Sequence, residues 1–167
     1  DDHYLVASRM VPYKRIELIA AAFARMPGRR LIVVGDGPNA ARVRDAAGDA
    51  PNIAFRGRVA GAELVALTQS ARACVFAAEE DFGIATVEAQ ACGTPVIAFG
   101  KGGARDIVRE GETGLFFDAQ TEDAIIDAVA RFEALAISPA ACRANAERFS
   151  EAAFRARMRR VVTEAAR

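Results

Sequence analysis

The stretch "ACVFAAEEDFGIATVEAQACGTPVIAFG", residues 73 to 100, decides the fold. It opens with a short apolar run typical of a buried strand, passes through an acidic loop, and then takes on a helical pattern. The helix should begin near Ile84 and stop at Gly93, and Pro95 should open a second apolar run. Two strands joined by a helix in so few residues predict neighbouring parallel strands with a crossover helix.

The same alternation extends in both directions along the chain. The apolar runs cover residues 3–8, 30–35, 52–57, 73–78, 95–100 and 114–117. The helical segments between them cover residues 15–26, 40–48, 61–71, 85–92 and 104–111. This rhythm predicts a Rossmann-like α/β fold, with a parallel sheet of about six strands and helices on both faces. Residues 121–135, 138–149 and 150–167 predict extra C-terminal helices.

Length and composition favour one domain over residues 1–167. Acidic and basic residues both number 22, so no charge excess indicates nucleic acid as a partner. The three cysteines are odd in number and far apart, which fits neither a disulfide framework nor a zinc site and indicates a reducing, cytoplasmic compartment. No apolar run approaches the roughly 20 residues that span a bilayer. Because the first residues enter a strand almost at once, we expect the sequence to be part of a longer chain.

The first loop after a strand, "SRMVPYKR", places Arg9 and Lys14 before a helix. Two cations at a helix entrance are unfavourable for the helix dipole unless an anion lies between them. A diphosphate would suit them, because arginine can donate to two phosphate oxygens while lysine adds a compact charge. The alternative is a solvated basic loop.

The second loop, "VVGDGPNAAR", matches the dinucleotide fingerprint through Gly35, Gly37 and Ala40. The acidic residue that this fingerprint requires about 20 positions later is missing, and Pro38 removes a backbone donor. We therefore expect Gly35 and Gly37 to form a tight turn from strand to helix that leaves room for a ligand.

The acidic loop and its helix contain Glu80 and Glu88, whose carboxylates should lie on the order of 10 Å apart. That separation is too wide for a shared proton, but it suits two hydroxyl-bearing rings joined by a diphosphate. The unsatisfied N–H groups of the first helical turn should point to the same ligand. Two alternatives remain: ordinary surface carboxylates, or a magnesium site formed by Glu79, Glu80 and Asp81.

These segments together resemble the retaining glycosyltransferases of family 4. The matching pieces are "SRMVPYK", "VVGDGP", "IAFRGRV" and "EEDFGIATVEAQACGTPVIA" followed by "GG", which cover nearly all of residues 4–150 in the family's order. The resemblance implies the C-terminal, donor-binding half of a GT-B fold, and it is nearest to the mannosyltransferase branch. It implies a hexosyltransferase, for example one that transfers mannose from GDP-mannose to a saccharide or lipid-linked acceptor.

Carried over to this sequence, the resemblance also implies roles for individual residues. Arg9 and Lys14 would hold the donor diphosphate, Glu80 would bind sugar hydroxyls, and Glu88 would bind the ribose diol. The remaining residues would line the donor site, with the backbone of the acidic loop next to sugar or phosphate: Gly35, Gly37, Arg58, Val59, Phe82, Gly83, Ile84, Gly102 and Gly103. For Gly102 and Gly103 the alternative is a simple helix start.

The resemblance implies no cofactor and no metal, only the nucleotide-diphosphate-sugar substrate. It implies an N-terminal domain of the same full-length chain as partner, and peripheral association with the inner face of a membrane. By itself this half should bind donor with little transfer. The alternative function is a non-catalytic nucleotide-binding module; a sugar phosphorylase with pyridoxal phosphate on Lys101 is disfavoured by its surroundings. The single histidine, His3, is expected to be structural.

The last helical segment carries an apolar stripe formed by Phe154, Met158, Val161 and Ala165. We expect this stripe to pack on its own domain, with contact to a second domain as the alternative.

Overall fold

A computed structural model describes residues 2–165. Its sheet consists of β1 (His3–Ala7), β2 (Arg30–Val34), β3 (Ile53–Gly57), β4 (Ala73–Phe76), β5 (Val96–Phe99) and β6 (Gly114–Phe117). All neighbouring strands are parallel, and they lie in the order β3-β2-β1-β4-β5-β6. The predicted Rossmann-like sheet is confirmed.

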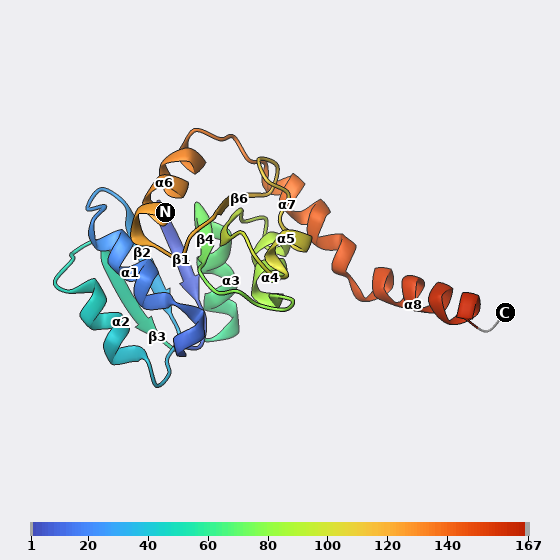
Figure 1. Cartoon of the computed structure of the whole chain (residues 1–167), viewed down its shortest axis with the longest axis horizontal. Coiled ribbons are helices and arrows are strands. Elements are labelled where there is room, and N and C mark those ends of the chain that lie inside the picture. The colour runs from blue at the N-terminus through green and yellow to red at the C-terminus, as the bar shows by residue number, and fades with distance from the viewer. Residues whose placement is uncertain (1, 166–167) are drawn as a thin grey trace.

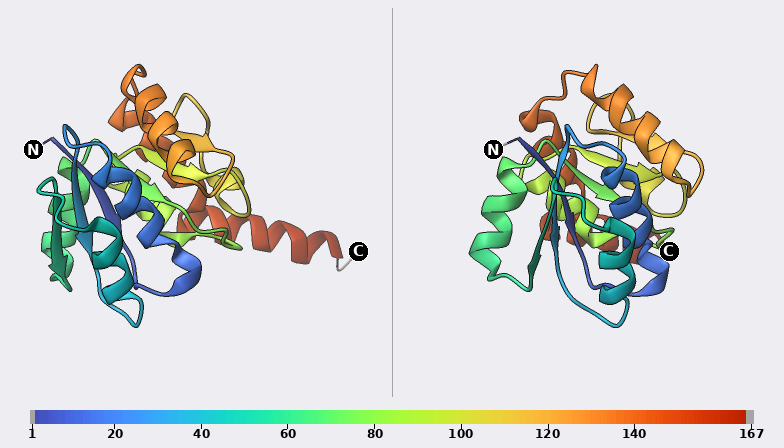
Figure 2. Two further views of the ribbon diagram at one scale, coloured as in Figure 1. Left: turned by 60° about the vertical axis from the view of Figure 1, so that its left-hand side comes forward. Right: turned by 90° about the vertical axis from the view of Figure 1, so that its left-hand side faces the viewer.

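Helices cover both faces of the sheet. One face packs against α1 (Ile16–Ala24), α2 (Ala40–Ala47) and α6 (Glu122–Glu133), and the other against α3 (Gly61–Ser70), α4 (Ile84–Ala91) and the short α5 (Ala104–Ile107). Figure 2 shows the two helical layers on either side of the strands. The remaining helices are α7 (Pro139–Ala146), which packs on α4, and α8 (Glu151–Ala165).

The core explains why the strands read as continuous apolar runs. In β1, Tyr4 and Val6 face α1 and α6, whereas Leu5 faces the layer of α3 and α4. All three side chains are at most 2% exposed. A parallel sheet with helices on both faces buries alternate residues in two separate cores, so no polar alternation remains in the sequence.

One predicted helix is much shorter than its sequence pattern. The segment 104–111 forms only α5, because Val108 already has extended backbone angles. Beyond it the Thr113 hydroxyl accepts a hydrogen bond from the Arg109 backbone N–H, at 3.0 Å. This turn directs the chain into β6, and a longer helix would prevent it.

The expectation that the stripe on α8 packs on its own domain is wrong. In Figure 1, α8 projects away from the rest of the molecule. Phe154 is 59% and Val161 is 55% exposed, and no residue of α8 is buried. Its main contact is with the 3-10 turn η2 (Glu147–Phe149), which directly precedes it in the chain. Ala165 is exposed too, so the whole predicted stripe is open in this structure.

His3 has the structural role that the sequence predicts. Its side chain is 1% exposed, and Nε2 lies 3.1 Å from the Leu67 carbonyl oxygen. Burial lowers the pKa of the imidazole. Cys74, Cys92 and Cys142 are all free thiols. Among residues 2–165, no helix combines the length and apolar character needed to cross a bilayer.

Candidate donor site

The strand order fixes where a ligand can enter the sheet. The chain leaves β1 toward β2 on one side, and β4 occupies the other side, so the crossovers diverge between β1 and β4. Ligands of open parallel sheets bind at the carboxyl ends of the strands at such a switch point. Lys14 follows β1 and Glu80 follows β4, so both belong to loops that border this point.

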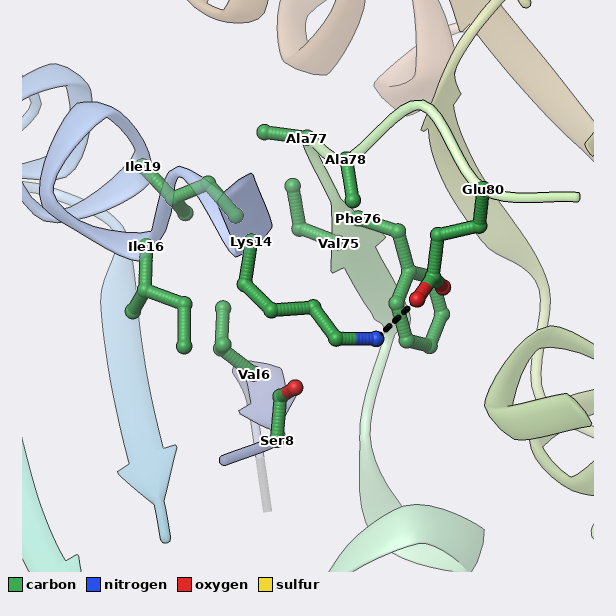
Figure 3. Close-up of a pocket in the computed structure, with 10 residues that line it drawn as sticks. All are labelled: Val6, Ser8, Lys14, Ile16, Ile19, Val75, Phe76, Ala77, Ala78 and Glu80. Atoms are coloured by element: carbon green, nitrogen blue, oxygen red, sulfur yellow. Dashed lines mark hydrogen bonds and ion pairs between the residues drawn. The ribbon is translucent and has the colours of Figure 1, made fainter. Parts of the chain in front are cut away.

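Lys14 and Glu80 form an ion pair across the switch point. Lys14 Nζ donates to Glu80 Oε1, and the two side chains are 19% and 22% exposed. Figure 3 shows the two side chains reaching toward each other above Ser8, beside the Phe76 ring. The pocket that they border is small, about 10 Å³, or room for one water molecule. The sequence reasoning assigned the two residues to separate parts of a ligand and did not predict their pairing.

Lys14 is positioned by a compact turn after β1. The Ser8 N–H donates to the Val34 carbonyl at 3.1 Å, and the fully buried Met10 anchors the middle of the loop. Pro12 opens the 3-10 turn η1 (Pro12–Lys14), and Arg15 then takes left-handed backbone angles. This sharp exit separates η1 from α1 and leaves Lys14 at the sheet edge.

Gly35 and Gly37 allow close contact between the loop after β2 and the loop after β1. A Cβ on Gly35 would lie 1.9 Å from the Ser8 carbonyl oxygen, and one on Gly37 would lie 2.4 Å from that of Met10. The two glycines therefore allow the loop after β2 to pack directly against the loop that carries Arg9. Their predicted tight turn is present, and the backbone of Ser8 and Met10 fills the side toward which a Cβ would point.

Glu80 is held by the glycine pair that follows β5. The Gly103 N–H donates to the Glu80 carbonyl at 2.7 Å. A Cβ on Gly102 would come within 2.3 Å of the same oxygen, and one on Gly103 within 2.3 Å of the Phe82 carbonyl oxygen. Gly103 also begins α5 as its N-cap. The helix start is therefore present, and in addition both glycines let the two loops pack backbone to backbone.

The donor loop, which we define as Glu79–Gly83, ends at the N-terminus of α4. Gly83 is its N-cap with φ 85°, and the helix begins at Ile84 as predicted. Phe82 is 49% and Ile84 is 64% exposed, so the first turn of α4 opens to solvent. Unsatisfied N–H groups at such a helix start, with the positive end of the helix dipole, form a site suited to an anion.

A second pocket, which we call the α3–α4 groove, lies between α3 and α4 and has a volume of about 420 Å³. Glu88 borders it, together with Ala7 at the end of β1 and Gly61 at the start of α3. Phe76, the last residue of β4, lines both this groove and the small pocket at the ion pair. Sequence reasoning placed Phe76 only in a buried strand. Its place at the carboxyl end of a strand beside the switch point was the signal that could have identified it.

Arg9, Arg58 and Val59 are predicted site residues that lie on other parts of the loops. Arg9 is exposed on the loop after β1, and Arg58 is exposed after β3, at the outer edge of the sheet. Val59 packs partly against the core beneath α3. The loop of Arg58 and Val59 leads into Gly61, which borders the α3–α4 groove. None of the three residues lines the pocket of Lys14 and Glu80, and none lines the α3–α4 groove.

The acidic residues of the donor loop do not gather as metal ligands would. Glu79 and Asp81 are exposed, whereas Glu80 turns to Lys14. Within residues 2–165, no group of three or more His, Cys, Asp or Glu side chains has the geometry to hold a metal ion. Of the predicted charged site residues, Lys14 and Glu80 meet as a cation and a carboxylate.

Comparison with known proteins now adds to this geometry. The family model described as "Glycosyl transferases group 1" matches residues 1–149. The chain belongs to this family. The resemblance to family 4 glycosyltransferases of the GT-B fold, stated from the motifs, is confirmed.

Two curated mycobacterial relatives carry transferase names. A GDP-mannose-dependent alpha-(1-6)-phosphatidylinositol monomannoside mannosyltransferase of Mycobacterium tuberculosis is 38% identical in an alignment that covers 74% of this chain and 36% of that protein. A D-inositol 3-phosphate glycosyltransferase of Mycolicibacterium paratuberculosis is 35% identical in an alignment that covers 73% of this chain and 30% of that protein. The chain thus spans about a third of the length of these relatives.

Solved structures show the same partial coverage. Sucrose-phosphate synthase from Thermosynechococcus elongatus matches with a TM-score of 0.78 and 31% identity, over 99% of this chain and 45% of that one. Anabaena HepE in complex with UDP matches with a TM-score of 0.80 and 22% identity, over 96% of this chain and 48% of that one. Because the HepE structure is only 22% identical to this chain, that match shows the fold alone. The chain corresponds to a little under half of either structure.

Proposed function

We propose that this chain is the donor-binding half of a retaining glycosyltransferase that transfers a hexose from a nucleotide-diphosphate sugar to a saccharide or lipid-linked acceptor. The observation that carries the proposal is the meeting of Lys14 and Glu80 at the switch point between β1 and β4. Folds of this kind bind ligands at this point, which supports a role for Lys14 with phosphate and for Glu80 with sugar hydroxyls. The names of the relatives and the family match support the same reaction class.

In this proposal the diphosphate lies between Lys14, Arg9 and the N-terminus of α4. As the bond from the anomeric carbon to the phosphate oxygen breaks, negative charge grows on the leaving diphosphate. Preorganised cations and helix N–H groups stabilise that charge more strongly than the ground state, which lowers the barrier. We expect these groups to supply the charge without a metal or cofactor.

The sugar and nucleoside then fall on either side of the diphosphate. Glu80 accepts hydrogen bonds from the sugar hydroxyls, aided by the backbone N–H groups of Phe82, Gly83 and Ile84. Glu88 accepts from the ribose diol in the α3–α4 groove, whose volume of about 420 Å³ leaves room for a nucleoside. The 38% identity to a GDP-mannose-dependent enzyme supports mannose as the sugar and guanine as the base. The acceptor would bind to an N-terminal domain of the same full-length chain.

Donor binding requires a change at the ion pair. Lys14 donates to Glu80 in this structure, so an arriving diphosphate must share or take over the lysine. Glu80 is then released toward the sugar hydroxyls. The ion pair therefore holds both groups at the switch point when no donor is bound.

Calorimetric titration of the 167-residue chain with GDP, GDP-mannose, UDP-glucose and ADP-glucose tests the proposal. At least one should bind saturably, and Lys14→Ala should weaken that binding by about tenfold, since a charge-assisted hydrogen bond contributes roughly 1.5 kcal/mol or more. Arg30→Ala is the matched control, because it removes an equal charge from the exposed amino end of β2. Absence of saturable binding by all four nucleotides would overturn the proposal. Binding without loss of transfer in a full-length Glu80→Ala variant would instead favour a non-catalytic nucleotide-binding module.

A further inference from the structure

The donor loop has a contact that the proposed function does not require. The Phe82 ring lies edge-on to the Phe149 ring, with centroids 5.9 Å apart and an interplanar angle of 74°. Phe149 is the last residue of η2, 67 positions later in the chain than Phe82 and outside every segment assigned to donor binding. The aromatic pair therefore joins the C-terminal region to the loop that carries Glu80.

Phe149 is attached to a firmly held part of the fold. In α7, just before η2, the buried Asn145 donates to Gln90 Oε1 of α4 at 2.6 Å and to the Ile107 carbonyl at 2.7 Å. Arg148 in turn donates to Asn145 Oδ1 at 2.7 Å. This network fixes η2 against α4 and α5, so Phe149 presents its ring from a rigid base.

Most side chains of the donor loop are exposed. Glu79, Asp81 and Phe82 are open to solvent, and the loop's backbone is held by close contact with Gly102 and Gly103. The Phe82 side chain is half exposed, and its ring packs on the Phe149 ring. The glycine pair thus supports the backbone of the loop, and Phe149 supports its aromatic side chain.

We propose that Phe149 is a positioning residue, which acts through Phe82 to hold the donor loop in the conformation that presents Glu80 and the first N–H groups of α4. The inference rests on the proposed function, because it names how that same site is kept in shape. Phe149 touches no substrate in this assignment. It lowers the conformational freedom that the loop would otherwise lose on binding, which is the general benefit of preorganisation.

The predicted effect is selective for part of the ligand. The donor loop faces the diphosphate and sugar, whereas Glu88 and the α3–α4 groove face the nucleoside. Loss of the aromatic contact should therefore weaken binding of the nucleotide sugar and leave binding of the nucleoside monophosphate nearly unchanged. The expected loss is roughly threefold to tenfold, the range that an edge-to-face aromatic pair accounts for.

The test compares Phe149→Ala and Phe149→Leu, which lose the aromatic ring, with Phe149→Tyr, which retains it. Leu135→Ala is the control, because it truncates a partly exposed apolar side chain beside the amino ends of β4 and β5. Two readouts are needed: calorimetric affinities for GDP-mannose and GMP, and hydrogen exchange of the amides of residues 81–84. Thermal unfolding identifies any variant that has lost its fold, and Phe149→Leu serves if Phe149→Ala has done so.

We expect faster exchange and a reduced affinity ratio of GDP-mannose to GMP in the alanine and leucine variants, with both restored in the tyrosine variant. Unchanged exchange in residues 81–84 of a folded Phe149→Leu protein would overturn the inference, whether or not any nucleotide binds. An equal loss for GMP and GDP-mannose would also overturn it, since that indicates general destabilisation. The wild-type chain could bind no nucleotide while the Phe149 variants still show faster hydrogen exchange in residues 81–84. In that case the proposed function is wrong, but the role of Phe149 in holding the donor loop is supported.

Discussion

Glu80→Gln should tighten the binding of a free nucleoside diphosphate. In this structure the Glu80 carboxylate is paired with the ammonium group of Lys14, so a diphosphate must compete with Glu80 for that lysine. Glutamine has nearly the same shape, but it carries no charge and pairs weakly with lysine. The substitution removes both the competing anion and its repulsion of the ligand, and these two effects have the same sign.

The magnitude follows from the exposure of the pair. At an effective dielectric constant of about 20, two charges in contact gain roughly 4 kcal/mol of gross Coulomb energy. The side chains of Lys14 and Glu80 are 19% and 22% exposed, so desolvation and side-chain ordering have already taken much of that gain. A net coupling of about 1 kcal/mol remains, which corresponds to about fivefold in affinity.

The assay is calorimetric titration of the wild-type chain, Glu80→Gln, Lys14→Ala and the double variant with the nucleoside diphosphate that binds best. Glu80→Gln should bind about fivefold more tightly, and this gain should disappear when Lys14 is already alanine. The sugar-linked nucleotide should gain less than the free diphosphate, because glutamine is a weaker acceptor for hydroxyls. Weaker binding of the free diphosphate by Glu80→Gln would refute the competition and with it the assigned geometry.

Three further predictions concern stability. Gly103→Ala should destabilise the fold by about 1–3 kcal/mol in urea unfolding, because its Cβ would meet a backbone carbonyl oxygen at 2.3 Å, whereas Gly61→Ala, with no atom within 4 Å, should not. Hydrogen bonds from Arg29 hold the pKa of Glu133 below its usual 4.5. The ionised Glu133 should therefore stabilise the folded protein near neutral pH, and this stabilisation should be lost as the pH falls through the lowered pKa. Glu133→Gln should remove this part of the pH dependence of the unfolding free energy. Phe154→Ser should change the unfolding free energy of this chain by less than about 0.5 kcal/mol, because the side chain is 59% exposed.

Each of these has an opposite result that counts against the structure. Equal stability of Gly103→Ala and Gly61→Ala would mean that the two loops are not packed backbone to backbone. If Glu133→Gln leaves the fall of the unfolding free energy at acid pH unaltered, the Arg29 contact is absent in solution. A large loss of stability in Phe154→Ser would mean that α8 packs on the domain after all.

The sequence alone determined the layers of the fold and the order of its parts. Short apolar runs with glycine or proline at their ends, alternating with helical segments, are typical of a parallel sheet with crossover helices, and β1 to β6 were each predicted within two residues of their observed ends. The motifs also identified the family, because loops at strand ends combine glycines and charges in a fixed order. The apolar runs, helical segments and loop motifs each span only a few neighbouring residues, so a single sequence is enough to identify them.

Only the tertiary structure decided which of those loops meet. The pairing of Lys14 with Glu80 depends on β4 lying next to β1, an adjacency between segments 66 residues apart that no local pattern encodes. The roles of Gly35 and Gly103 likewise came from backbone that approaches from another loop, and α8 proved exposed because nothing in the described chain lies opposite its apolar face. Contacts of this kind are set by how whole layers pack together, so the sequence supplied the side chains and the packing chose their partners.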